Sequence, residues 1–311
     1  MTRLSQWLPT VVDSRIRLFA WLSLTVQTLI IGTGGAVRLT GSGLGCDTWP
    51  RCTAQSWVVL PEQGIHGAIE FGNRLMTFVL VIVAFVTLAL IWKLRRERRD
   101  LFVLALVLLA GIPAQAVIGG VSVWTGLNPY IVGLHFVVSV VLVGTAAALV
   151  FRVYSAAGAR TRAVGLPLLI VTHVGTLALA VTVLIGIVTT GAGPHAGDAR
   201  APRNNLDPQI LQHVHAWAAY ALLAVTIVIL VGALLLRRRF TLLAAAGLLL
   251  IEAVQIIVGI TQARLGLPEV LVGIHMVLAS LLAASYVVVL LSMKNPLPLA
   301  PRTPPAPSRL P

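Results

Sequence analysis

The sequence predicts an all-α integral membrane protein whose eight transmembrane helices form two parallel, pseudo-repeated four-helix bundles. Three observations lead to this fold class. Of the 311 residues, 58% are hydrophobic and 11% are charged, whereas ordinary globular proteins have roughly 25% charged residues. The mean hydropathy of +0.93 indicates more apolar surface than a soluble fold of this length can bury. Eight apolar segments and an internal repeat with a constant offset are the other two observations.

Eight segments are long enough to cross a bilayer, for which ~20 apolar residues are needed. They span residues 18–37, 66–92, 101–122, 131–151, 165–190, 209–236, 240–262 and 271–293. Charged or turn-forming residues break the pattern between them, as in the basic run at 93–100 and the three arginines at 237–239. The first span is too long, and starts too late in the chain, to resemble a cleaved signal peptide.

The distribution of basic residues predicts the orientation in the membrane. Lys and Arg number 17 in the N-terminal segment, the tail and the loops at 93–100, 152–164 and 237–239, against five in the other loops. This bias predicts a multi-pass plasma-membrane protein with both termini in the cytoplasm. Because the charges lie in short clusters between spans, the net charge of +13 indicates the lipid bilayer as partner and no nucleic acid.

The spans and loops divide the chain into four expected parts. These are a cytoplasmic N-terminus (1–17), a first four-helix bundle (18–153), a second four-helix bundle (154–293) and a disordered Pro-rich cytoplasmic tail (294–311).

The two bundles are predicted from an internal repeat. Gln115-x-x-x-Gly119 recurs as Gln255-x-x-x-Gly259, and the segment that ends at His135 (VGLH) recurs at the same offset as VGIH, which ends at His275. Each half then holds four spans, and an even number gives both halves the same orientation about an axis along the membrane normal. Chance similarity between Leu/Val/Gly-rich segments is the competing interpretation.

Histidines near the external ends of the spans are candidate functional residues, because ionisable groups inside a membrane are costly and mark function by default. His135 opens the fourth span, His215 lies in the first turns of the sixth, and His275 opens the eighth. Two imidazoles from neighbouring helices suit the axial positions of a heme iron, which predicts a cofactor heme between His215 and His275. The alternative is that each histidine hydrogen-bonds a neighbouring helix. His173, in the fifth span, is expected to be a core residue.

The first half differs from the second at the equivalent positions. His66, Glu70 and Asn73 fall on one stripe of the second span, and Arg74 follows. A carboxylate here suits proton transfer near a reacting group. Arg74 can pair with Glu70 or with a heme propionate. We therefore expect a fixed cofactor heme in the second half, and a reacting heme or substrate in the first.

The two cysteines, Cys46 and Cys52, lie in the first external loop. A closely spaced pair outside the cytoplasm predicts a disulfide. Two free thiols, or a metal site that lacks further ligands, are the alternatives.

Together these segments resemble the heme A synthase family, which converts heme O to heme A for cytochrome oxidase assembly. The resemblance rests, in chain order, on GGAVRLTGSGLGC at 34–46, the WPRC that ends at Cys52, EFGNR at 70–74, LH at 134–135, QHVH at 212–215 and VGIH at 272–275. It implies an enzyme that oxidises a porphyrin methyl group, by successive hydroxylations, to a formyl group. Heme O synthase is a candidate partner, and the electron donor or acceptor stays open.

The resemblance also implies roles for single residues. They are heme b ligation by His215 and His275, substrate heme O binding by His135, a functional carboxylate at Glu70, and the external cysteine pair Cys46 and Cys52. The family pattern Glu-x-x-His-Arg has Asn73 in place of its histidine here, and Asn is a poor iron ligand. Either His135 is then the one histidine ligand of the substrate iron, or His66 ligates from two turns further out, about 10 Å at ~1.5 Å per residue.

Two other functions fit part of the sequence. A non-enzymatic b-type cytochrome explains the histidines, but leaves Glu70 and the cysteine loop without a role. A transporter suits parallel repeats and buried polar groups, and it predicts no stoichiometric heme.

Overall fold

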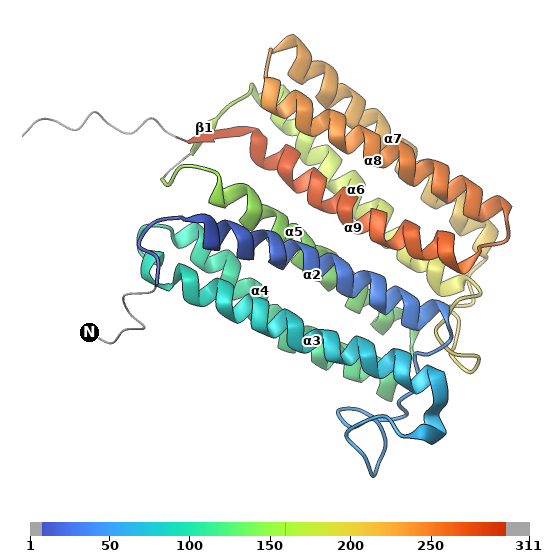
Figure 1. Ribbon diagram of the computed structural model, residues 1–311. Helices are drawn as coiled ribbons and strands as arrows, with labels where there is room; N and C mark the ends of the chain where they lie inside the picture. Colours follow the sequence, from blue (N-terminus) through green and yellow to red (C-terminus); the bar gives the residue numbers. More distant parts are fainter. Residues whose placement is uncertain (1–7, 159, 297–311) are drawn as a thin grey trace, which may run out of the picture.

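The computed structural model describes residues 8–158 and 160–296. Eight helices of the described chain are long and apolar enough to cross a membrane, which confirms the predicted all-α integral membrane fold (Figure 1). They are α2 (Ser14–Leu39), α3 (Gly64–Ile91), α4 (Arg99–Trp124), α5 (Pro129–Val153), α6 (Leu166–Ala192), α7 (Pro208–Leu235), α8 (Arg239–Arg264) and α9 (Glu269–Ser292). Short 3-10 helices, η1 (Pro61–Gln63) and η2 (Trp92–Leu94), flank α3.

Side-chain caps set where several helices begin. The carboxylate of Asp13 accepts hydrogen bonds from two backbone N–H groups at the start of α2, and that of Asp207 does the same for α7. Asn128 caps α5 through the N–H of Tyr130. Proline follows the cap at α5 and α7, where its missing N–H costs no helical hydrogen bond.

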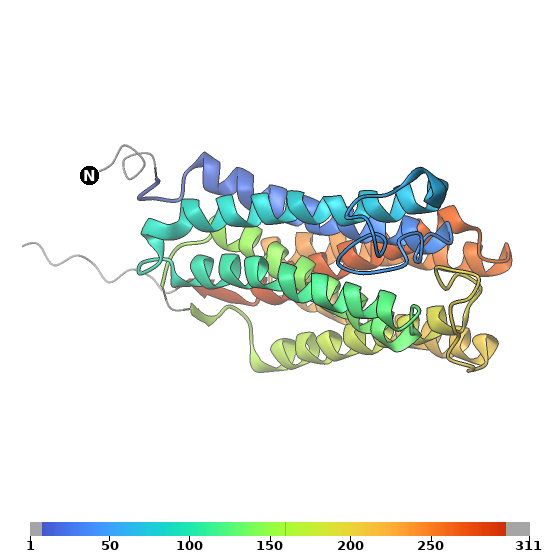
Figure 2. The same cartoon turned by 90° about the horizontal axis from the view of Figure 1, so that it is seen from below.

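The helices pack as two groups that share one seam. In the first group, α2 to α5, each helix contacts its two neighbours and the ring closes between α2 and α5. In the second group, α6 to α9, the contact between α6 and α9 is slight. The groups meet where α9 packs against α2 and α5 (Figures 1 and 2). That a single axis relates the two groups stays a prediction.

The two ends of the helices differ in packing. One end, which we call the arginine end, holds the 93–99 and 237–239 loops, and the other, the disulfide end, holds Cys46 and Cys52. Apolar clusters fill both groups at the arginine end, with Leu101 and Leu149 in the first and Leu248 and Tyr286 in the second. Towards the disulfide end the second group is packed less closely. Apart from Gly191, the buried residues of its helices lie within 168–175, 222–233, 241–252 and 280–292.

A short antiparallel sheet at the arginine end ties the connection between α5 and α6 to the residues that follow α9. Strand β1 (Arg160–Arg162) pairs with β2 (Lys294–Pro296), so that Arg162 lies opposite Lys294. The first three residues of the predicted tail, 294–296, thus form a strand, and the disorder expected of the tail stays a prediction. Residues 1–7 of the predicted N-terminus and 297–311 of the predicted tail lie outside the described residues.

Candidate functional site

His215 on α7 and His275 on α9 come together inside the second group. Their ring centroids are 6.2 Å apart, and their planes lie at 74°. The Nδ1 of His215 is 3.1 Å from the carbonyl oxygen of Thr182 on α6. Such a bond orients an imidazole and leaves its Nε2 for a ligand. The Nδ1 of His275 is buried and has no hydrogen-bond partner within the described chain.

This arrangement fits a heme between the two rings. With nitrogen–metal bonds of about 2 Å, imidazoles on opposite faces of one iron have centroids roughly 6 Å apart. A glycine passes close to each ring. A Cβ built on Gly186 of α6 would lie 2.8 Å from Cε1 of His215, and one on Gly259 of α8 would lie 3.1 Å from Cε1 of His275. Any larger residue at these glycines would therefore displace the rings.

Both halves use a glutamine to hold the backbone of a histidine. Gln255 on α8 donates to the carbonyl of His275 (3.0 Å), and Gln115 on α4 donates to that of His135 (3.1 Å). The two bonds are equivalent in the internal repeat, since glutamine and histidine both recur at the offset found in the sequence. The first half adds Ser139, whose hydroxyl accepts a further bond from Gln115.

The first group offers one histidine where the second offers two. His135 on α5 lies beside Gly119 of α4, where a built Cβ would be 3.2 Å from its Cε1. Its Nδ1 is buried and lacks a partner among the described residues. The amide oxygen of Asn73 on α3 accepts a hydrogen bond from Thr33 of α2 (2.7 Å). The asymmetry expected from the sequence is thus present in the arrangement of side chains.

His66 lies at the start of α3, away from these contacts. Its ring is exposed, and its Nδ1 is 2.9 Å from the hydroxyl of Ser42. It lines a cavity of about 530 Å³ that Asp198 also lines. In the described part of the chain, no hydrogen bond or ring contact joins His66 to His135.

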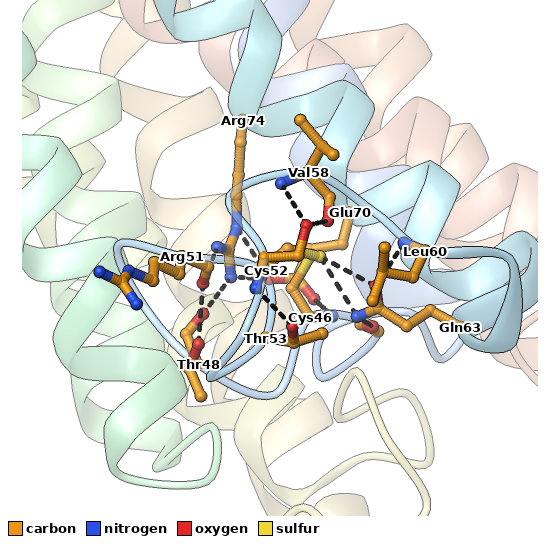
Figure 3. The surroundings of a disulfide bond; sticks show 12 residues. Cys46, Thr48, Arg51, Cys52, Thr53, Val58, Leu60, Gln63, Glu70 and Arg74 are labelled. Carbon is orange, nitrogen blue, oxygen red and sulfur yellow. Dashed lines mark hydrogen bonds and ion pairs between the residues drawn. A yellow bond between two sulfur atoms is a disulfide. The ribbon is translucent and has the colours of Figure 1, made fainter.

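Glu70 is a buried carboxylate with both oxygens engaged (Figure 3). Its Oε1 accepts from Arg74 one turn further along α3 (2.6 Å), and its Oε2 accepts from the backbone N–H of Cys46 (2.7 Å). Arg74 also donates to the carbonyls of Thr48 and Arg51. Glu70 is one of the two partners predicted for Arg74, and the pair fastens the loop that holds Cys46 and Cys52 to α3.

The predicted disulfide between Cys46 and Cys52 closes this loop (Figure 3). Gln63 of η1 lies against it, with its Nε2 3.2 Å from the Sγ of Cys52 and 2.7 Å from the carbonyl oxygen of Gly45. Sequence reasoning missed Gln63. Gln63 lies close to Glu70 in the sequence, but this does not predict that the loop folds back against its side chain.

Two further histidines lie on α6 and in the loop that follows it, His173 and His195. His173 is exposed on α6, so the expectation of a core position is wrong. A helix that is apolar all round gives no sequence signal for the face that meets lipid. His195 binds the carbonyl of Leu267 through its Nε2 (2.8 Å), while its own carbonyl accepts from Arg38 of α2 (2.6 Å). Arg38 also donates to the carbonyl of Thr190 (3.1 Å), and sequence reasoning missed this contact between the groups.

Comparison with curated proteins finds relatives that carry one name, heme A synthase. The protein of Listeria welshimeri is 32% identical over 127 residues, 40% of this chain and 41% of that relative. The Bacillus pumilus protein is 29% identical over 154 residues (48% of each), and the Lysinibacillus sphaericus protein is 35% identical over 129 residues (40% and 41%). The matched segments thus cover less than half of these relatives.

A family comparison covers far more of the chain. Residues 17–287 match the COX15-CtaA family model, described as cytochrome oxidase assembly protein. The match runs from the first turn of α2 into α9 and so includes all eight helices. The chain therefore belongs to the COX15-CtaA family of cytochrome oxidase assembly proteins.

Proposed function

We propose that this chain is a heme A synthase, a membrane oxidoreductase that converts heme O to heme A by oxidising a porphyrin methyl group to a formyl group. The observation that carries the proposal is the pairing of His215 and His275 at 6.2 Å, beside Gly186 and Gly259. Membership of a cytochrome oxidase assembly family and curated relatives named heme A synthase support it.

In this proposal His215 and His275 hold heme b. When bound, heme b supplies a one-electron redox centre. Neighbouring residues orient the two histidines for iron binding. The carbonyl of Thr182 directs the Nδ1 proton of His215 and so leaves Nε2 for the metal. Gln255 fixes the backbone of His275 on α9.

Heme O binds as substrate in the first group, against His135. Asn73 accepts a hydrogen bond from Thr33 and is a poor iron ligand. The substrate iron therefore has one histidine ligand from α3 and α5, which is His135. Glu70 lies one turn from Asn73 towards the disulfide end of α3 and serves as a proton-transfer or charge-stabilising group. Its bonds to Arg74 and Cys46 hold it at a defined position.

We assign the arginine end to the cytoplasmic face of the plasma membrane, by the positive-inside rule. Both chain termini are then cytoplasmic, and the disulfide loop is external, where disulfides persist. Heme O synthase is the proposed source of the substrate. The redox partner is a membrane-accessible electron donor or acceptor.

The test of this function is heme extraction. The full chain is co-expressed with a heme O supply, and the extracted hemes are separated by chromatography. We expect heme A together with heme b. Heme b alone would favour the b-type cytochrome, which also uses the pair of histidines, and the absence of any stoichiometric heme would favour the transporter.

Gln255→Leu is expected to weaken retention of heme b by about tenfold, because the carbonyl of His275 loses the side-chain hydrogen bond that fixes it to α8, a bond worth about 0.5–1.5 kcal/mol. The heme b content of the purified protein, from its reduced absorbance spectrum, measures this. Gln115→Leu is the matched control, since it makes the same change beside His135 and should leave heme b in place. An equal loss of heme b from both variants would show that they destabilise the chain as a whole.

A further inference from the structure

A second cavity lies at the arginine end, far from the histidines. Its volume is about 320 Å³, and it opens where β1 and the start of α6 meet the turn between α7 and α8. Ligand sites range from roughly 300 to 1,000 Å³. The lining residues are Arg162, Ala163, Val164, Gly165, Leu236 and Arg238.

The lining of this cavity is cationic. Arg162 and Arg238 are the two charged residues among its six, and neither takes part in an ion pair within the described chain. Arg238 is half-buried and donates to the carbonyl of Ala163, so it is held at the cavity wall. Asp100 acts electrostatically on Arg160 of the same strand, but it is already paired with Arg98. An anion in this cavity would therefore face two arginines that no carboxylate of the described chain neutralises.

The adjoining sheet adds to the positive charge. Lys294 of β2 lies directly opposite Arg162 of β1 in the antiparallel ladder. Like charges in this position destabilise a strand pair unless a counter-ion lies between them. Gly165, the N-cap of α6, also lines the cavity and gives no side-chain cap, so unpaired N–H groups of the first turn add a partial positive charge.

Exposed leucines at the helix ends indicate what kind of anion fits. Leu236 lines the cavity and is half exposed, and Leu166 and Leu235, at the ends of α6 and α7, are likewise exposed. A phospholipid of the adjoining leaflet can place its phosphate at the two arginines and its acyl chains against these leucines, whereas a free phosphate makes no use of them. Basic pockets between transmembrane helices on the cytoplasmic side suit anionic headgroups.

We propose that this cavity binds the phosphate of an anionic phospholipid, with Arg162 and Arg238 on the headgroup and the rim leucines on the acyl chains. The bound lipid neutralises the repulsion between Arg162 and Lys294. It thereby stabilises the β1–β2 pair that ties the α5–α6 connection to the end of α9.

The experiment uses the full chain, delipidated in detergent and titrated with phosphatidylglycerol. Bound lipid is counted by native mass spectrometry, and thermal unfolding is followed in parallel. We expect one tightly held phosphatidylglycerol and a raised Tm, and neither effect with phosphatidylcholine. Inorganic phosphate and glycerol 3-phosphate are the soluble arms. If they raise the Tm as much as the lipid does, the site takes a soluble anion and the lipid assignment is overturned.

Variants of the cavity test whether its arginines are what retains the lipid. Arg162→Gln combined with Arg238→Gln is expected to weaken retention of phosphatidylglycerol about 30-fold, since each basic residue near a headgroup is worth about a fivefold change. The matched control is Arg96→Gln with Arg99→Gln, which removes two exposed charges at the arginine end of the first group. Equal weakening by both pairs would overturn the proposal in favour of general charge attraction.

Arg162→Gln alone covers the case in which the double variant does not fold. The Arg162 side chain is exposed and makes no hydrogen bond to described residues, so its loss leaves the packing intact. A roughly fivefold weakening is expected. Retention at the level of the unaltered chain would contradict the proposal.

Discussion

His275→Ala is expected to abolish heme b binding and, with it, the formation of heme A. The substitution removes one of two imidazoles whose centroids are 6.2 Å apart, and leaves an iron with His215 alone. Metal affinity falls steeply when a ligand is lost, and His275 is the ring that faces His215 among the described residues. The reduced-minus-oxidised spectrum of purified protein reports heme b, and chromatography of extracted hemes reports heme A.

Two matched variants make this result specific. His213→Ala changes a histidine close to His215 on the same helix, where it is exposed and bonded to the carbonyl of Gln209, and should leave both hemes unaffected. His135→Ala should lower substrate heme while heme b remains. If His275→Ala keeps a full complement of heme b, the second group does not hold heme as proposed.

Glu70→Gln is expected to lower the rate of heme A formation by about 10²-fold or more, the usual contribution of a group that moves a proton. The amide oxygen can still accept from the N–H of Cys46, and Arg74 can still donate to the carbonyls of Thr48 and Arg51, so the loop keeps these attachments to α3. The negative charge and the ion pair with Arg74 are lost. The measurement is heme A formed per heme b, which corrects for the amount of folded protein.

Arg74→Gln separates chemistry from anchoring. It removes the same ion pair and the bonds to Thr48 and Arg51, but keeps the carboxylate. If Glu70 acts on the substrate, Arg74→Gln should retain much more activity than Glu70→Gln. If Glu70 only anchors the disulfide loop, the two variants should fall together. Full activity in Glu70→Gln would remove this carboxylate from the reaction.

The helices and the paired histidines are the features that sequence predicts well here. An apolar run of ~20 residues has few alternatives to a transmembrane helix, so each helix end falls close to its predicted position, about one turn away at most. His215 and His275 stand out in the sequence because an ionisable side chain inside a membrane is costly and marks a functional site by default. The constant offset of the repeat also pairs His275 with His135.

Contacts made by loops and by helix faces could not be predicted in the same way. Glu70 is predicted as a functional carboxylate, but its bond to Cys46 depends on the path of the loop between α2 and α3, which no periodicity encodes. The contacts of Gly119, Gly186 and Gly259 with the histidine rings could not be predicted either, since a close approach depends on how neighbouring helices cross. The exposure of His173 could not be predicted either, because its helix is apolar on every face and no periodicity marks the exposed side.

The hydrogen bonds of Arg38 have a consequence for folding. Arg38 joins the end of α2 to the carbonyls of His195 and Thr190, and His195 in turn holds Leu267 between α8 and α9. With α9 also packed against α2 and α5, neither four-helix group can open at this end without breaking contacts of the other. The two halves therefore form a single cooperative unit, in which local unfolding of one lowers the protection of the other.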